Sequence, residues 1–140
     1  MTVSGCRRCD GGWPDEHYRI AALATSVAYL NEDQYFTGWT VLVLNHHATE
    51  LWHLPAGERA QLIEDVTRVA RALADEFAPV KMNYELLGNQ VAHIHWHLIP
   101  RLPADPVPTM PVWVHDHPRR APTDAERRDR IERLQRRLTR

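Results

Sequence analysis

The sequence predicts an α+β fold whose sheet is mainly antiparallel, with one long helix and a second helix at the C-terminus. Apolar, strand-like segments lie on both sides of a single long helical pattern, and a shorter helical pattern ends the chain. This order of elements favours an α+β arrangement. The 140 residues are about one domain long, and the apolar and charged fractions, 44% and 25%, are ordinary for a soluble globular protein.

Apolar segments precede the long helix. "YRIAAL" and "SVAYL", within Tyr18–Leu30, predict two short strands or one bent strand. The polar, turn-rich "NEDQYFTG" then leads into "WTVLVL", Trp39–Leu44. Because this last segment is rich in β-branched residues and is apolar on both faces, it is typical of a central strand.

Two prolines delimit the long helix. Pro55 suits the first position of a helix, and Pro79 ends the pattern. Between them, apolar residues recur at helical spacing at Leu62, Val66, Val69, Leu73 and Phe77. The strand-like "KMNYELL" follows, and a "GN" turn then leads to a further predicted strand, "VAHIHWHLIPR", over residues 91–101.

The C-terminal part consists of a proline-rich arm and a helix. Residues 102–122 predict an irregular but ordered arm. Its two histidines, His115 and His117, could reach an active site, but we expect them to be solvated. We therefore expect a main domain over residues 1–122, which includes the arm, and an arginine-rich helix over residues 123–140.

The final helix has a distinct charge. Thr123 or Asp124 can cap it. Residues 119–140 carry 9 arginines and 4 acidic residues, whereas residues 1–118 carry 8 basic and 14 acidic residues. This balance indicates a docked helix with a solvated basic face, so we do not expect a nucleic-acid partner. The helix has one apolar stripe: Ile131, Leu134 and Leu138.

The sequence predicts a cytoplasmic protein without a membrane partner. No apolar run approaches the roughly 18 residues of a membrane span. The N-terminal "MTVSGCRRCDGG" lacks the apolar centre of a signal peptide. Cys6 and Cys9 are the only cysteines. At this spacing in a cytosolic chain they indicate half of a metal site or a redox pair, not a structural disulfide.

Three histidines at alternate positions are the clearest functional pattern. On a strand, His93, His95 and His97 would share one face, because alternate side chains point the same way. At about 3.3 Å per residue the outer two would lie about 13 Å apart, too far to share one metal ion. A row of imidazoles instead suits a polyphosphate, because imidazoles can donate to its oxygens and one can attack phosphorus.

The motif His93-Ile-His95-Trp-His97-Leu-Ile resembles the signature of the histidine triad (HIT) family of nucleotide hydrolases and transferases. That signature is H-φ-H-φ-H-φ-φ, where φ is apolar. The likeness extends over roughly residues 18–102, and "PVWV" at 111–114 is similar to the C-terminal arm of some bacterial members. The resemblance implies a HIT-like fold and a bacterial branch that resembles diadenosine polyphosphate hydrolases.

The resemblance also implies a role for individual residues. The middle histidine of the family attacks the α-phosphorus of a nucleotide and forms a nucleotidyl-histidine, which assigns the nucleophile to His95. The third histidine lies against the phosphate, which indicates His97. An Asn or Asp after the second strand binds the ribose, and here it is Asn31. Polar side chains near the phosphate and the leaving group correspond to Asn83, Asn89 and Gln90.

The resemblance further implies a structural zinc ion. Some bacterial members with an N-terminal Cys-x-x-Cys bind zinc through both cysteines, a histidine after the central strand and the first histidine of the triad. In this chain the ligands would be Cys6, Cys9, His47 and His93, a normal tetrahedral set. The alternative ligand His46 is less well placed than His47 relative to the family's spacing.

One position departs from many members of the family. They have Gly-His where this chain has Gly38-Trp39. A histidine near the phosphates is therefore missing, and the substrate preference of those members does not carry over directly.

The expected function is hydrolysis or transfer at the α-phosphate of a nucleotide, either a dinucleoside polyphosphate or a nucleoside phosphoramidate. Phosphate as the second acceptor would make the enzyme a phosphorylase. A nucleotide-binding module without turnover is one alternative, and a metalloenzyme that uses His93 and His95 as an H-x-H pair is another. The family also implies a homodimer whose two sheets join edge to edge.

Overall fold

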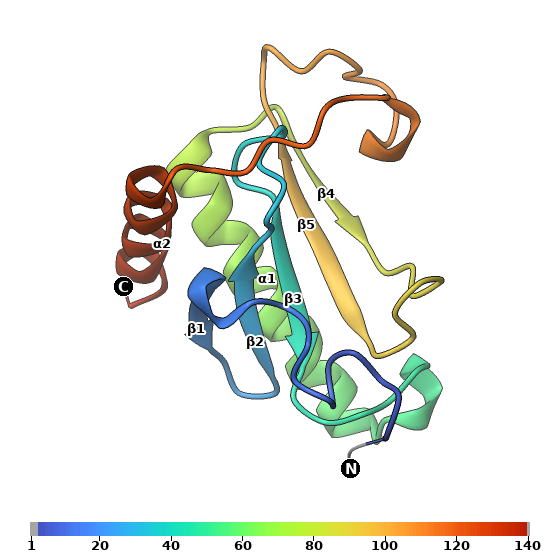
Figure 1. Cartoon of the computed structure of the whole chain (residues 1–140). Coiled ribbons are helices and arrows are strands. Elements are labelled where there is room, and N and C mark those ends of the chain that lie inside the picture. The colour runs from blue at the N-terminus through green and yellow to red at the C-terminus, as the bar shows by residue number, and fades with distance from the viewer. Residues whose placement is uncertain (1–2, 140) are drawn as a thin grey trace.

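The computed structural model of the chain describes residues 3–139 and contains one five-stranded antiparallel sheet (Figure 1). Residues 1–2 of the predicted main domain and residue 140 of the predicted final helix lie outside the described residues. The strand order is β1-β2-β3-β5-β4. The elements are β1 (Arg19–Ala22), β2 (Ser26–Leu30), β3 (Thr40–Leu44), α1 (Ala56–Phe77), β4 (Lys81–Glu85), β5 (His95–Arg101) and α2 (Asp124–Leu138).

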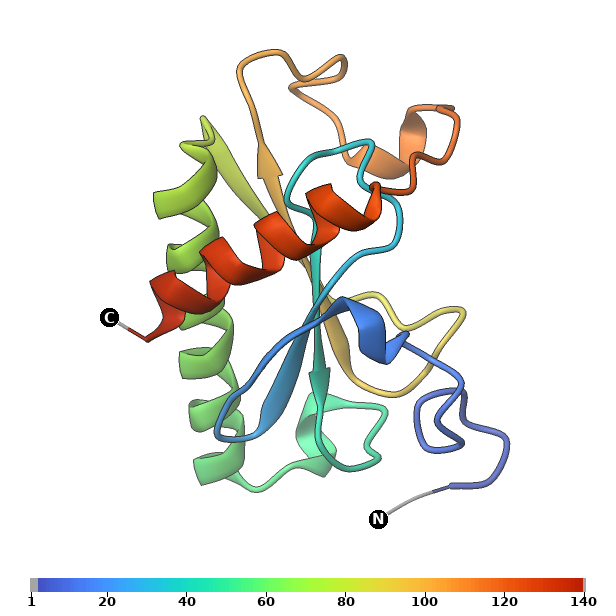
Figure 2. The ribbon, with the colours of Figure 1, turned by 60° about the vertical axis from the view of Figure 1, so that its left-hand side comes forward.

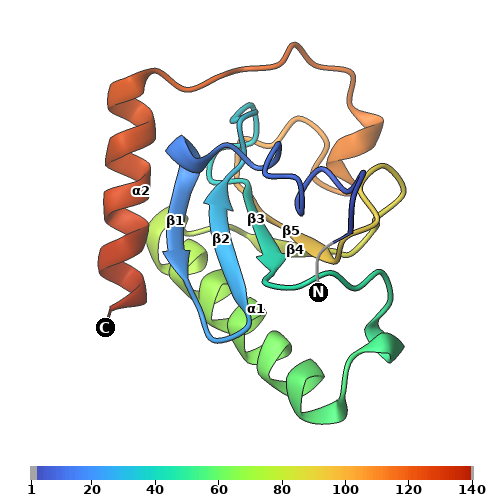
Figure 3. The ribbon, with the colours of Figure 1, turned by 60° about the horizontal axis from the view of Figure 1, so that its bottom comes forward.

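The two faces of the sheet have different partners. Helix α1 covers one face, and the N-terminal segment crosses the other, so that the sheet lies between them (Figure 3). The α1 face is apolar and buried, with Leu30, Leu42 and Leu98 packed against Val66, Val69 and Leu73 of the helix. On the opposite face Val27, Tyr29, Val41 and Val43 form a smaller cluster with Trp13. This opposite face also carries His95 and His97, since His95 pairs with Val43 and His97 with Val41 in the antiparallel register.

Helix α2 docks along the outer side of α1 and β1 (Figure 2). Thr123 caps it, with Glu126 completing a capping box. Arg133 and Arg137 pair with Glu76 of α1. The predicted apolar stripe is confirmed, because Ile131, Leu134 and Leu138 are all buried. Within residues 3–139, neither α1 nor α2 combines the length and the apolar character that a membrane crossing requires.

The strand that carries the triad is shorter than the sequence predicts. β5 begins at His95 rather than at residue 91, so His93 lies before the strand. Strand β5 begins late because β3, its hydrogen-bonding neighbour, ends at Leu44. The backbone of Ile94 instead donates to the carbonyl of Ala48 and accepts from the N–H of Leu44. His93 is therefore free to serve a different site from His95 and His97.

Arg101, at the end of β5, holds the proline-rich arm against the sheet. It is 3% exposed and forms an ion pair with Asp105. Its guanidinium also donates to the backbone carbonyls of Val107 and Met110, at 2.6 and 2.7 Å. Charge-assisted hydrogen bonds from a buried arginine fix backbone more firmly than neutral ones. The arm thus brings its short 3-10 turn, Val112–Val114, beside the triad face.

Candidate active site and metal site

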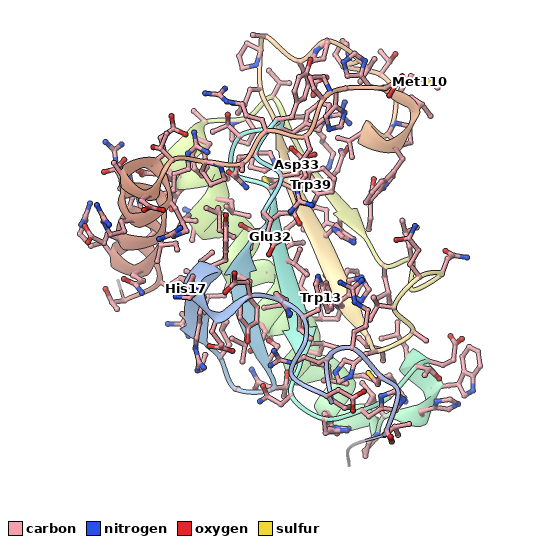
Figure 4. The ribbon with its side chains drawn as sticks, viewed as in Figure 1. Trp13, His17, Glu32, Asp33, Trp39 and Met110 are labelled. Carbon is pink, nitrogen blue, oxygen red and sulfur yellow. The ribbon has the colours of Figure 1, made fainter. Side chains whose placement is uncertain are left out.

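A cavity of about 250 Å³ opens on the triad face of the sheet. In Figure 4 the labelled side chains of Trp13 and Trp39 both lie on this face of the sheet, in front of the strands. Of the triad, His95 and His97 line the cavity and His93 does not. The other lining residues are Arg7, Trp13, Asn31, the loop 87–91 and Trp113.

His95 has one ring nitrogen fixed by the backbone. Its Nδ1 lies 2.7 Å from the carbonyl oxygen of His93. A carbonyl only accepts hydrogen bonds, so Nδ1 carries the proton and Nε2 carries the lone pair. Burial lowers the pKa of His95, opposed by its hydrogen bond to His93, so the ring is neutral at pH 7. The residue therefore offers the cavity an unprotonated nitrogen, which is what a nucleophile requires.

His97 is held by a different partner. The indole N–H of Trp39 donates to its Nδ1 at 3.1 Å. Burial, with a smaller contribution from His95, lowers the pKa of His97 to about 4. The rings of His95 and His97 lie 5.1 Å apart between centroids. Two neutral imidazoles thus stand side by side in the cavity.

Trp13 and Trp113 enclose the two histidines. The Trp13 ring meets His95 edge-on at 4.8 Å, and the Trp113 ring meets His97 edge-on at 5.3 Å. The Trp113 indole N–H donates to Glu85 of β4 at 2.5 Å, which fixes the arm beside the site. The sequence analysis did not select Trp13 or Trp113. Trp113 lies within the quoted "PVWV" segment, whereas the sequence around Trp13 carries no comparable signal.

The four predicted metal ligands converge at one place. Cys6 Sγ lies 3.6 Å from His93 Nδ1, and Cys9 Sγ lies 3.6 and 3.7 Å from the Nδ1 atoms of His47 and His93. Among the described residues, the ligand atoms of Cys6, Cys9, His47 and His93 all lie within 4.8 Å of one another. Bonds of about 2.0 Å to nitrogen and 2.3 Å to sulfur give tetrahedral edges of roughly 3.3–3.8 Å. The three sulfur–nitrogen distances fall in this range, so the cluster could hold a tetrahedral metal ion.

The histidines near the cluster differ in whether they face the cysteine sulfurs. The Nε2 of His93 donates to the carbonyl oxygen of Leu44 at 2.8 Å, which leaves Nδ1 unprotonated and directed at the sulfurs. His46 turns away from the cluster and pairs with Glu58 of α1. An H-x-H metal site has no geometric support, because the Nδ1 of His95 bonds the backbone of His93 and the ligand nitrogen of His93 faces the cysteines.

The predicted nucleotide-binding residues lie in two places. Asn31, Asn89 and Gln90 line the cavity with His95 and His97. The Asn31 amide donates to the carbonyl of Asp33 at 3.0 Å, which sets the orientation of its side chain. Asn83 lies elsewhere: it is on β4, does not line this cavity, and accepts a hydrogen bond from Arg101 at 2.7 Å. The structure thus gives Asn83 a part in anchoring the arm.

The two histidines of the arm are not simply solvated, which corrects the expectation from the sequence. His117 Nε2 lies 2.9 Å from a carboxylate oxygen of Asp33, and its ring stacks on Tyr35. His115 lies 3.2 Å from the Tyr35 hydroxyl. Burial works against protonation of His117, but hydrogen bonds to Asp33 and to the His115 carbonyl outweigh it and raise the pKa of His117. These contacts fix the loop that follows Asn31.

Arg7 is a cavity residue that the sequence analysis overlooked. It lines the cavity from the N-terminal segment, between the two cysteines of the metal cluster. The signal for it was available, because a residue between two ligands of a cluster that also includes His93 must lie close to the triad. Arg8 has a different role, since it donates to the Tyr29 hydroxyl at 2.7 Å.

Comparison with known families agrees with this geometry. The HIT domain model matches residues 18–104, which is more than half of the chain. The chain therefore belongs to the HIT domain family. The observed five-stranded antiparallel sheet with its two helices confirms the α+β, HIT-like fold expected from the sequence.

Particular relatives support the same conclusion. The curated Protein hit of Bacillus subtilis (strain 168) is 31% identical over 80 residues, 54% of this chain and 55% of that protein. The match thus spans about half the length of that relative. A histidine triad protein from Bradyrhizobium japonicum has a TM-score of 0.79 at 30% identity, covering 86% of this chain and 89% of that chain. A Zn-bound histidine triad family protein from Mycobacterium smegmatis shares the fold, with a TM-score of 0.67 at 22% identity over 96% and 91% of the two chains.

Proposed function

We propose that the chain is a nucleotidyl hydrolase or transferase that cleaves at the α-phosphate of a nucleotide through a nucleotidyl-histidine intermediate. One observation carries the proposal. The hydrogen bond from His95 Nδ1 to the His93 carbonyl leaves Nε2 with its lone pair, in a cavity also lined by a second neutral histidine and an arginine. A fixed, neutral imidazole is a nucleophile near neutral pH without a separate base.

The reaction runs in two displacements. His95 Nε2 attacks the α-phosphorus, a P–N bond forms, and the bond from phosphorus to the leaving group breaks, with its electron pair departing on the leaving group. A water molecule then attacks phosphorus and releases a proton to the solvent, the P–N bond breaks, and its electron pair returns to Nε2. Arg7 and the Nε2–H of His97 face the same cavity and stabilise the charged phosphate oxygens.

A turnover screen tests this function. The protein would be incubated with diadenosine tetraphosphate and with adenosine phosphoramidate, and the products separated by chromatography. We expect AMP from at least one of them. Addition of inorganic phosphate would distinguish a hydrolase from a phosphorylase, because transfer to phosphate yields ADP. Nucleotide binding without AMP or ADP would instead support a binding module.

Asn31 is proposed to bind the ribose. It follows β2, lines the cavity, and has its amide nitrogen already engaged by the Asp33 carbonyl, so its side-chain oxygen is available to accept from a hydroxyl. We expect Asn31→Ala to raise KM about 10-fold for adenosine substrates, which is the effect of losing about one hydrogen bond. Steady-state kinetics would check this, with 2′-deoxy substrates as the matched control. If ribose and deoxyribose substrates behave alike in the unmodified protein, the assignment is wrong.

The proposed site also includes a structural zinc ion held by Cys6, Cys9, His47 and His93. These donors fit the ion in type and spacing. When bound, zinc would cross-link the N-terminal segment to the end of β3 and the start of the triad. The cluster also positions Arg7 beside the cavity, because Arg7 lies between the two cysteine ligands in the sequence.

We also propose that the chain forms a homodimer through β4 and α1. Strand β4 ends the sheet, whereas the other end, β1, has α2 beside it. Apolar side chains are exposed on both elements: Val80 just before β4 by 69%, Tyr84 on β4 by 49%, and Ile63 on α1 by 46%. An uncovered strand edge with apolar side chains favours pairing with a second copy. Light scattering at micromolar concentration is expected to give twice the chain mass, and a monomer mass would contradict the proposal.

A further inference from the structure

We propose that Trp39 is a positioning residue that locks His97 as a neutral hydrogen-bond donor, and that it thereby selects substrates whose leaving group departs as a phosphate rather than as an amine. The inference rests on the proposed transfer of a nucleotidyl group to His95. It concerns Trp39, at the position where many members of the HIT family have a histidine.

The direction of one hydrogen bond determines the tautomer of His97. The indole Nε1 of Trp39 lies 3.1 Å from His97 Nδ1. An indole nitrogen is only a donor, so His97 Nδ1 must be the acceptor. The proton of the neutral ring therefore lies on Nε2. His95 has the opposite tautomer, with its proton on Nδ1. The two rings thus present the cavity with one lone pair and one N–H.

The surrounding residues hold Trp39 in the position from which it donates to His97. It is 3% exposed, and its backbone carbonyl accepts from Asn31 N and Gln34 Nε2, at 2.8 and 2.9 Å. Gly38 precedes it with a φ of +89°, and a Cβ at Gly38 would lie 2.8 Å from the Phe77 ring. This position therefore requires glycine. Trp113 packs edge-on against the indole, with centroids 5.2 Å apart.

The locked tautomer prevents His97 from acting as an acid. A protonated His97 would carry an N–H on Nδ1 that points at the N–H of Trp39, and two donors cannot share one hydrogen bond. If the neutral ring gave up its Nε2 proton, an imidazolate would remain, which is inaccessible near pH 7. Burial also disfavours the cation, with the pKa of His97 lowered to about 4. His97 can therefore donate a hydrogen bond to phosphate but cannot transfer a proton.

This limitation separates the two classes of substrate. When a phosphoramidate is cleaved, the P–N bond breaks and the amine must gain a proton, because an amide anion is not a viable leaving group. When a polyphosphate is cleaved, the P–O bond breaks and the bridging oxygen keeps the electron pair as a stable phosphate anion. A histidine at position 39 could accept from His97 Nδ1–H and so permit the imidazolium. Tryptophan removes that option and favours a dinucleoside polyphosphate.

Two measurements on the unmodified protein test the proposal without any variant. Nitrogen-15 NMR of histidine-labelled protein at pH 7 is expected to show His97 protonated on Nε2 alone. The kcat/KM for diadenosine tetraphosphate is expected to exceed that for adenosine phosphoramidate by at least about 100-fold, the usual minimum worth of a general acid. A protonated Nδ1 on His97, or equal kcat/KM for the two substrates, would overturn the proposal. No turnover of either substrate, with the expected tautomer present, would overturn the proposed function and the leaving-group selection that rests on it.

Three variants isolate the hydrogen bond. Trp39→His is expected to raise phosphoramidate turnover relative to polyphosphate turnover by about 10-fold or more, and to let His97 titrate nearer neutral pH. Trp39→Phe keeps an aromatic ring without the donor and is expected to give a mixture of His97 tautomers. Trp113→Phe is the matched control, because Trp113 touches the His97 ring without a hydrogen bond to it, and its His97 spectrum is expected to match that of the unmodified protein. An unchanged tautomer in both Trp39 variants would overturn the positioning role.

Discussion

The variant His95→Ala is expected to lose turnover of nucleotide substrates by several orders of magnitude while it still binds nucleotide. The loss follows because the lone pair on His95 Nε2 forms the P–N bond, and the site holds no equivalent nucleophile, since His97 presents an N–H. Binding should persist, because the proposed contacts to the nucleotide come from other lining residues, among them Asn31 and Arg7. Steady-state kinetics and calorimetric titration with a nucleotide measure the two quantities separately.

Two further variants calibrate this result. His97→Ala removes one hydrogen-bond donor to the phosphate and is expected to cost about 10²–10³ in kcat, less than the loss of the nucleophile. His17→Ala is the control, because its side chain is 80% exposed and lies away from the triad (Figure 4). Near-normal turnover in His95→Ala would contradict the nucleophile assignment.

The second large effect concerns the metal cluster. Cys6→Ser is expected to lose zinc and to lower the free energy of unfolding by at least about 2 kcal/mol, or roughly 6 °C in Tm. The reason is that the cluster ties the N-terminal segment to His47 and His93, and Cys6 lies 3.6 Å from the His93 ligand nitrogen. The expected loss is smaller than the roughly 10–16 kcal/mol of a zinc-finger peptide, because the sheet and α1 have their own core.

Elemental analysis of protein purified without added metal, together with thermal unfolding, checks this prediction. One zinc ion per chain is expected in the unmodified protein. His46→Ala is the matched control, because His46 is adjacent to a proposed ligand but pairs with Glu58 outside the cluster. Full zinc occupancy in Cys6→Ser would show that the ligand set is wrong.

The main elements of the fold were predictable from local patterns. The helical spacing between Pro55 and Pro79 predicted α1, which spans Ala56–Phe77. The stripe of α2 was equally clear, because one apolar row on an otherwise charged helix has only one way to dock. The start of β5 was not predictable. Residues 91–94 have a strand-like composition, but a strand also needs a partner, and β3 ends at Leu44.

The sequence predicted several of the residues that the structure brings together in the cavity and the metal cluster, but not their protonation. Alternate spacing selected the three histidines, and the family resemblance suggested how their roles divide. The tautomer of His97 depends on a contact between distant segments, the hydrogen bond from Trp39, and no local pattern encodes it. For the same reason the sequence did not reveal that His117 pairs with Asp33. Asn83 was expected near the phosphate from its position in the family, whereas here it bonds Arg101.

Mass spectrometry of the adduct tests the central claim most directly. The unmodified protein would be mixed with diadenosine tetraphosphate and quenched within seconds at alkaline pH, because the P–N bond of a nucleotidyl-histidine breaks in acid. Intact-mass measurement is expected to show one added adenylyl group per chain, and peptide mapping to place it on His95. The same treatment of His95→Ala is expected to leave the mass unchanged. Turnover without an adduct on the unmodified protein, or an adduct that maps to another residue, would contradict covalent catalysis by His95.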